Sequence, residues 1–345
     1  MLGGGVFVTQ NKVLPGSYIN IVSASSSSAN LGDRGVVAIA LPLAKAAGTV
    51  IEITASQFVT DSEEILGKEY NSTDLDPLRE IFLHSNKAYV YDLGTENTVS
   101  EVLAALEPYD FNVLCAYTSK AEDVTQYIAG VKSWRDNYGK KCQVVVYNAT
   151  APNNEGVINV VSTVSDKSVP AYALVAWVAG AEAGCNINAS CTNMLYDGKY
   201  TIVADKTQTE LEKMIEDGLF AFHNVYDDIR VLEDINSLTE TTVDKGEDFK
   251  SNQTIRVVDQ IANDIARIFN TKYLGKIPNN ASGRVSLWGD IVAHHRQLES
   301  LQAIESFDAT LVTVEQGQTK KSVVVNDVIT VTNAMSQLYM TVVIQ

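Results

Sequence analysis

The sequence has 345 residues, of which 46% are hydrophobic and 20% are charged, so it holds enough apolar material for about two domains. Its formal net charge of -16, from 26 basic and 42 acidic residues, argues against a nucleic-acid partner, because binding to phosphates requires a cationic surface. No segment reaches the roughly 18 apolar residues of a membrane-spanning helix, which argues against membrane insertion.

The first residues and the cysteines indicate the compartment. The glycine-rich start lacks the basic residues and apolar run of a secretory signal. The four cysteines form no Cys-x-x-Cys pair, and Cys115 and Cys142 lie in apolar runs where cysteine usually behaves as a small hydrophobic side chain. We therefore expect free thiols and folding in the cytoplasm.

The first 22 residues alternate apolar patches with residues that break regular structure. The patches are residues 6–9 and 18–22, and Pro15-Gly16 separates them. This pattern predicts an extended arm that carries two short strand segments. The serine-rich stretch that follows, residues 23–28, is typical of a loop.

From about residue 75, strand and helix patterns alternate, which predicts a layered α/β unit with parallel strand pairs. Thr98 and Glu101 have the spacing of a capping box at the start of one helix. Two strands are expected before this unit, at 36–41 and 50–54. Within it the predicted strands are 88–91, 111–117, 143–147 and 157–161, and the predicted helices are 77–84, 98–106, 122–138 and 171–183.

After about residue 200 the order of elements changes. A second capping box, Thr207 with Glu210, opens a helix that ends at Gly218, and a hairpin is expected around residues 226–228. Two long helices follow, at 255–269 and 282–304. The later strands are predicted at 309–314, 323–326, 328–332 and 338–344, with the first two paired across the Gly317 turn.

The first long helix has an apolar stripe at spacings of three and four residues. The stripe consists of Ile255, Val258, Ile261, Ile265, Ile268 and Phe269, and polar residues lie on the other side of the helix, namely Asp259, Asn263, Arg267 and Asn270.

No catalytic, cofactor or metal site is predicted. The glycines at residues 3–5 lack the Lys-Ser/Thr of a phosphate loop, and the acidic stretch at 233–248 lacks the ligand spacing of a calcium loop. His294 and His295 are adjacent on a helix, so their side chains should point about 100° apart and not share a metal. We expect them on a partly exposed helix face, and we expect Asp227-Asp228 to be ordinary turn residues.

The last eight residues form an apolar strand pattern without a charge or a proline. Leu338, Met340, Val342 and Ile344 share one face, and Tyr339 lies on the other. A free strand of this kind would aggregate, so it must dock. It either completes the sheet of its own domain or adds a strand to a neighbouring subunit.

The sequence resembles the sheath subunit of a contractile tail, in the short form of phages of Gram-positive hosts and of R-type tail-like bacteriocins such as diffocins. The features that carry the resemblance are spread over most of the chain. They are Pro15-Gly16-Ser17-Tyr18-Ile19, Leu31-Gly32-Asp33-Arg34-Gly35-Val36, Asn263-Asp264-Ile265-Ala266-Arg267, Ser322-Val323-Val324-Val325-Asn326-Asp327 and Leu338-Tyr339-Met340-Thr341-Val342-Val343.

The resemblance implies an α+β multidomain fold of α/β sandwich-like domains, with extended N- and C-terminal β arms that exchange strands between subunits. The expected parts are an N-terminal arm (1–20), a discontinuous core sheath domain (21–88 and 197–322), an inserted outer α/β domain (89–196) and a C-terminal arm (323–345). The expected interface residues of the arms are Val6, Phe7, Val8, Thr9, Tyr18, Ile19, Val323, Val325, Leu338, Tyr339, Met340, Val342 and Ile344.

The resemblance also implies a structural role without catalysis, nucleotide or metal. Copies of the chain would form hexameric rings stacked in a helical sheath around an inner tube protein, with baseplate and tail terminator proteins at the two ends. A baseplate trigger would release the strained, extended sheath to a shorter form that drives the tube through a target envelope. The subunit would be part of a virion or a tail-like particle.

We further hypothesise that the second long helix faces the tube, because Arg284, His294, His295 and Arg296 form a cationic island in an acidic chain; the alternative is a merely solvated helix face. Two other functions stay open. One is a sheath-like component of a related contractile injection or secretion system. The other is an α/β enzyme, which the sequence disfavours because no glycine-rich turn follows the strands at 111–117 and 143–147.

Overall fold

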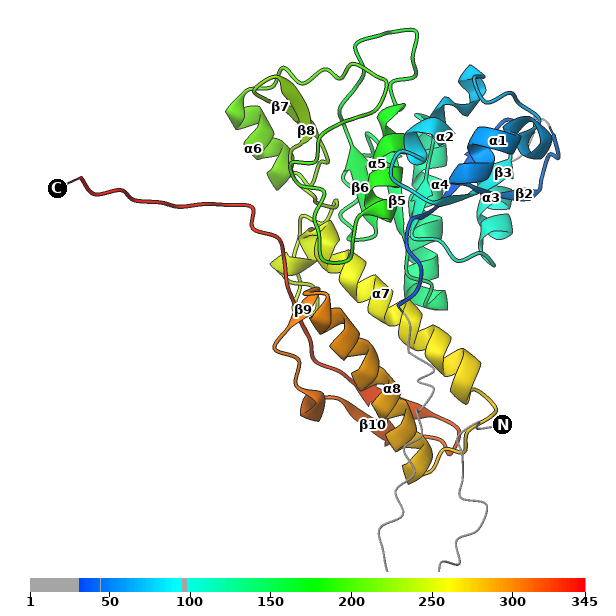
Figure 1. Ribbon diagram of the computed structural model, residues 1–345, viewed down its shortest axis with the longest axis vertical. Coiled ribbons are helices and arrows are strands. Elements are labelled where there is room, and N and C mark those ends of the chain that lie inside the picture. The colour runs from blue at the N-terminus through cyan, green and yellow to red at the C-terminus, as the bar shows by residue number, and fades with distance from the viewer. Residues whose placement is uncertain (1–30, 44, 95–97, 345) are drawn as a thin grey trace, which may run out of the picture.

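The computed structural model describes residues 31–43, 45–94 and 98–344. Within these ranges the chain has an α/β lobe, built from residues 36–231, and a helical lobe, built from residues 247–332. Figure 1 shows the two lobes stacked along the long axis of the molecule, with one long helix running between them. No helix in the described ranges is both long and apolar enough to cross a membrane.

The α/β lobe is organised around one six-stranded sheet in the order β2-β3-β1-β4-β5-β6. Its strands pair in parallel, except β2, which runs antiparallel to β3. The predicted α/β unit with parallel pairs is therefore confirmed. The strands are β1 (Val36–Leu41), β2 (Val50–Thr54), β3 (Lys87–Asp92), β4 (Val113–Cys115), β5 (Gln143–Tyr147) and β6 (Val157–Val160).

This sheet corrects the expected domain boundary between residues 88 and 89. Strand β1, expected in the core sheath domain, pairs with β4 of the expected inserted domain. The boundary also cuts through β3 itself, because that strand begins at Lys87. Hydrogen bonds between distant strands, which local sequence patterns do not record, join the two segments into one sheet.

Helices cover both faces of the sheet. Successive side chains of β1 point to opposite faces and nearly all of them are buried, so each face needs a covering layer. Val37 and Ile39 face a core with α1 (Ala55–Leu66), α2 (Asp76–Ile81) and α5 (Leu174–Gly184). Ala38 and Ala40 face a second core with α3 (Val99–Leu106) and α4 (Ala121–Ser133). Helix α5 is buried from Leu174 to Ala183, which confirms the predicted core helix.

Both predicted capping boxes are present. The Thr98 backbone N–H donates to Glu101 Oε2 at 2.7 Å at the start of α3, and the Thr207 N–H donates to Glu210 Oε2 at 2.8 Å at the start of α6 (Gln208–Glu216). A third capping box, Thr54 with Gln57, starts α1. The predicted hairpin is also confirmed, with β7 (Phe222–Val225) and β8 (Asp228–Val231) paired antiparallel.

The helical lobe contains α7 (Asn252–Ile268) and α8 (Ala281–Ser300), joined through a π-helical turn at Phe269–Tyr273. The predicted hairpin across Gly317 is confirmed, because β10 (Thr313–Gln316) pairs with β11 (Val323–Asn326). Strand β12 (Thr330–Val331) pairs with β9 (Ile304–Glu305). The remaining short turns are 3-10 helices at Thr73–Leu75, Glu247–Lys250 and Ala309–Leu311 and a π-helical turn at Trp134–Tyr138.

Candidate assembly interface

The segment after β12 is an extended chain that leaves the body of the protein (Figure 1). Its apolar side chains are exposed, including Leu338 at 85%, Tyr339 at 87% and Ile344 at 93%. Met340, Val342 and Val343 are exposed as well. A run of apolar side chains of this length, in water and without a partner, is the kind of surface that docks onto another protein.

Hydrogen bonds fix the base of this segment. The Thr332 N–H donates to the Ala303 carbonyl at 3.1 Å, and the Gln253 side chain bonds to the backbone of Thr332 at 3.1 Å and of Ala334 at 2.9 Å. Residues 335–344 make no backbone hydrogen bond with other described residues. The segment therefore does not complete a sheet of its own chain within the described ranges, which was one of the two predicted alternatives.

The predicted C-terminal arm begins too early. Val323 and Val325 belong to β11 and pair with Gln316 and Val314 of β10 in the same chain. Val323 is also half-buried against the core of α7 and α8. The free segment starts after Ala334, because the two short strand pairs hold the chain to Val331 and the bond from the Ala334 N–H to Gln253 holds it at Ala334. The N-terminal interface residues, Val6, Phe7, Val8, Thr9, Tyr18 and Ile19, lie outside the described residues.

The predicted tube-facing cluster is wrong for its two histidines. His294 and His295 are both 0% exposed, because their rings turn inward and bond to Asp264 and Asp327. Arg296 is exposed, whereas Arg284 is half-buried and bonds to Asn279. Charge density in the sequence did not reveal that carboxylates from two other segments meet the imidazoles. A tube-facing role stays a prediction for the two arginines.

The polar side of α7 is a contact surface between the lobes. Arg135 of the α/β lobe forms a bidentate pair with Asp259, with Nη2 2.9 Å from Oδ1, and both residues are buried. The Asn263 amide exchanges two hydrogen bonds with the backbone of Lys141, at 3.2 and 2.7 Å. Paired charges and satisfied amides are tolerated in such an interface because each group has a partner.

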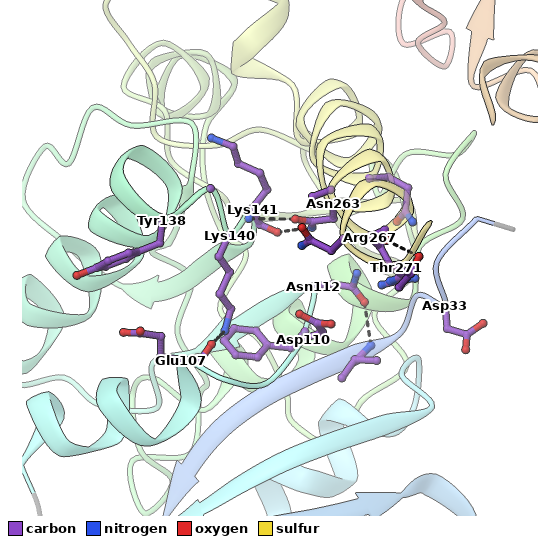
Figure 2. Close-up of a pocket in the computed structure, with 16 residues that line it drawn as sticks. Asp33, Glu107, Asp110, Asn112, Tyr138, Lys140, Lys141, Asn263, Arg267 and Thr271 are labelled. Carbon is purple, nitrogen blue, oxygen red and sulfur yellow. Dashed lines mark hydrogen bonds between the residues drawn. The ribbon is translucent and has the colours of Figure 1, made fainter. Parts of the chain in front are cut away.

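A cleft of about 470 Å³ lies beside this contact (Figure 2). Lys140 reaches along its wall and donates to the carbonyls of Leu106, Glu107 and Tyr109 at 3.0, 2.9 and 2.6 Å, which satisfies the C-terminal end of α3. Burial lowers the pKa of Lys140. The ammonium group of Lys140 is therefore held by three backbone carbonyls at the edge of the cleft.

One buried group has the composition of a metal site but already contains a cation. Glu182, Cys191 and Asp234 bring potential ligand atoms within 4.8 Å of one another. The Arg256 guanidinium lies among them, 2.7 Å from Glu182 and 3.3 Å from Asp234. It supplies the positive charge that a metal would otherwise provide, so the residues do not fit a metal ion. We name Arg256, Glu182 and Asp234 the buried triad.

Burial and the neighbouring carboxylate raise the pKa of Glu182 well above its usual value. Burial acts in the same direction on Asp234, but Arg256 and several hydrogen bonds outweigh it and lower the pKa of Asp234. The surroundings of the triad thus favour the protonated form of Glu182 and the ionised form of Asp234. The triad then links α5 and the loop after β8 to α7.

Comparisons with known proteins agree with this architecture. The family model described as phage tail sheath protein central domain matches residues 94–237, and the model described as phage tail sheath C-terminal domain matches residues 244–345. The tail sheath protein of Clostridium phage phiCD119 is 28% identical over 230 residues, which cover 66% of this chain and 64% of that protein. The chain spans 39%, 47% and 64% of the three curated relatives it matches.

Solved structures extend the likeness to most of the chain. The sheath tail protein of Desulfitobacterium hafniense is 26% identical, with a TM-score of 0.75 over 87% of this chain and 93% of that one. The helical sheath of the anti-feeding prophage in its contracted state shares the fold, with a TM-score of 0.73 at 15% identity over 96% of this chain and 99% of that one. The two sheath models together span most of the sequence, and this chain belongs to the phage tail sheath family.

Proposed function

We propose that the chain is a structural, non-enzymatic subunit of a contractile tail sheath. Copies of it would polymerise around an inner tube by strand exchange and change from an extended to a compact lattice, driving the tube through a target envelope. The observation that carries the proposal is the extended segment 335–344, with its apolar side chains exposed and its backbone unpaired among the described residues. Such a segment can add a strand to a sheet edge of another copy.

The energetics favour many linked copies over an isolated dimer. Burying Leu338, Met340, Val342 and Ile344 yields about 6–12 kcal/mol at most. Ordering eight residues of backbone costs about 8–16 kcal/mol. For one arm the free energy gained by burial and the entropy cost nearly cancel. Binding becomes favourable when the main-chain hydrogen bonds of the arm form and a second arm pairs beside it. We propose residues 6–9 as that second arm.

The partners follow from the same proposal. They are other copies in stacked hexameric rings, an inner tube protein, and baseplate and terminator proteins, in a virion or tail-like particle assembled in the host cytoplasm. Solved sheaths of the anti-feeding prophage and of an extracellular contractile injection system have the same fold, and both are in a contracted state. The low identity of these matches, 15% and 13%, supports the architecture alone.

Deletion of residues 336–345 tests the proposal. Because the deleted side chains are exposed in the single chain, the variant should keep its circular dichroism spectrum and melting temperature. Purified full-length chain should form tubes in negative-stain micrographs, and the deletion variant should not. Val243→Asp is the matched control, because Val243 is an equally exposed apolar residue outside the segment, and this variant should still form tubes. Tubes of the deletion variant would refute the strand-exchange role, and their absence from the full-length chain would refute self-assembly.

A further inference from the structure

A cavity of about 950 Å³ lies at the carboxyl ends of three neighbouring strands of the large sheet. It is lined by Leu41 at the end of β1, by Leu93 directly after β3 and by Tyr117 two residues after β4. The start of α2 and the first two turns of α4 also line it. We call it the sheet-end cavity. It shares no lining residue with the cleft beside α7.

The topology of the sheet explains why a cavity forms at this place. After β1 the chain passes through β2 to α1 and α2, which cover one face of the sheet. After β4 it passes directly to α4, which covers the other face. Because β1 and β4 are neighbours and their connections diverge, a crevice is left at their ends. Open α/β sheets bind ligands at such positions.

Four tyrosine side chains line the sheet-end cavity, namely Tyr117, Tyr127, Tyr172 and Tyr200. None of their hydroxyl groups forms a hydrogen bond with another described residue. Tyr127, on α4, is only 5% exposed, and the rings of Tyr117 and Tyr172 pack edge to face with centroids 4.8 Å apart. A buried tyrosine hydroxyl usually has a hydrogen-bond partner. Unpartnered hydroxyls in the lining of a cavity therefore point to a ligand that forms hydrogen bonds.

The tyrosines can both donate and accept hydrogen bonds. Burial raises the pKa of Tyr117, Tyr127 and Tyr200 above the usual value, so the three hydroxyl groups keep their protons at neutral pH. A protonated phenol is a donor and an acceptor, and its ring offers apolar surface beside the hydroxyl. The lining thus suits a ligand that combines apolar faces with polar groups.

The charges in the lining largely cancel. Asp76 forms an ion pair with Lys199, and Asp123 lies 4.0 Å from Lys120. The third carboxylate, Asp74, has a lysine of its own at 2.8 Å. Because each carboxylate has a cationic partner, the cavity favours a neutral ligand over an ion.

A ligand with a phosphate group fits the cavity poorly. Strand β1 is followed by Pro42 and β4 by Tyr117-Thr118-Ser119-Lys120, so neither strand leads into the glycine-rich turn that cradles phosphate. Helix α4 places Glu122 and Asp123 in its first turn, where their charges would repel an anion near the N-terminus of the helix.

We propose that the sheet-end cavity binds a neutral sugar unit. A pyranose ring presents C–H groups on its faces and hydroxyl groups around its edge, which match the rings and the hydroxyl groups of the four tyrosines. The cavity volume also lies within the roughly 300–1,000 Å³ of small-molecule sites. This binding function goes beyond the assembly of a sheath and does not depend on tube formation.

Isothermal titration calorimetry of the full-length chain tests the proposal. The probes are glucose, galactose, mannose, N-acetylglucosamine and N-acetylgalactosamine, each also as its methyl glycoside and its 6-phosphate. We expect at least one neutral sugar to bind at millimolar or lower concentration, and its 6-phosphate to bind more weakly. If the methyl glycoside keeps the affinity, the ligand is the end unit of a glycan; if it does not, the ligand is a free sugar.

Two variants test the role of the tyrosine hydroxyl groups. Tyr127→Phe removes one hydroxyl but keeps the buried ring, so the chain should keep its melting temperature and bind the sugar about three- to tenfold more weakly. Tyr117→Phe should have a similar effect. Tyr226→Phe is the matched control, because Tyr226 is 99% exposed and lies outside the cavity, and this variant should bind like the unaltered chain.

Three results would overturn the proposal: no binding of any neutral probe, tighter binding of the 6-phosphate, or unchanged affinity in both Tyr127→Phe and Tyr117→Phe. If one of these variants fails to fold, the other decides. Sugar binding and tube formation are read out separately, so a chain that binds no sugar can still form tubes, and a chain that forms no tubes can still bind a sugar.

Discussion

Replacing Arg256 by methionine should destabilise the protein strongly. The arginine side chain is 2% exposed, and its partners Glu182 and Asp234 are 1% exposed. Because the triad favours the ionised form of Asp234, the change leaves this buried carboxylate without its counter-charge. Breaking a buried pair by removing one partner costs about 3–5 kcal/mol. We expect Arg256→Met to lower the free energy of unfolding at pH 7 by this amount.

A second substitution should recover most of that loss. Asp234→Asn in the Arg256→Met background removes the uncompensated charge, while the amide oxygen can still accept the Cys191 N–H that Asp234 Oδ2 accepts at 2.9 Å. Replacing both members of a buried ion pair by neutral groups is often close to neutral. The single-variant penalty should also shrink as the pH falls, because acid protonates the unpaired carboxylate in the variant.

Urea unfolding read by circular dichroism and tryptophan fluorescence measures these differences. Trp134 and Trp177 report on the α/β lobe and Trp288 on the helical lobe, so two probes show whether the lobes unfold together. A loss below about 1 kcal/mol for Arg256→Met, or no recovery on adding Asp234→Asn, would contradict the assignment of one ionised pair in the triad.

Three further outcomes are expected in the same assay. Gly180→Ala should cost about 1–3 kcal/mol, because its new Cβ would lie 2.5 Å from the Ile81 carbonyl oxygen, whereas Gly289→Ala on α8 has open space and should be neutral or slightly stabilising. Burial acts to raise the pKa of Asp264, but its hydrogen bonds hold that pKa below the usual 3.8. The stabilisation by the ionised carboxylate is therefore present above about pH 4, and the cost of Asp264→Asn should shrink as the pH falls below about 4. Arg135→Lys should cost about 1.5–3 kcal/mol, because lysine cannot form the bidentate pair with the carboxylate on α7.

Local signals in the sequence predicted local structure well. The capping boxes at Thr98 and Thr207 and the hairpin across Gly317 all depend on residues a few positions apart, and all three are confirmed. The buried helix α5 could be predicted for the same reason, because its apolar residues are consecutive in the sequence. The start of α1 at Thr54 was missed, although Gln57 supplies the same capping signal as the two glutamates that were found.

Contacts between distant segments were not readable in the same way. The burial of His294 and His295 depends on Asp264 and Asp327, which are about thirty residues away on either side. A histidine pair on a helix with little amphipathic character looks solvated until those carboxylates are placed. The boundary at residue 88 failed for a similar reason, because strand pairing across the sheet leaves no mark in the local pattern.

Helix α7 has a mechanical consequence for any assembly of these chains. Its 17 residues span roughly 25 Å, with Arg256 anchored to the α/β lobe near one end and Asp264 anchored to α8 nearer the other. A strut secured in this way resists bending, since deformation would separate buried charges. When the folded parts of two neighbouring copies shift past one another, the displacement would then pass almost entirely to the extended segments that connect the copies. Elastic energy would accumulate in the lattice joints, while each folded body kept its shape.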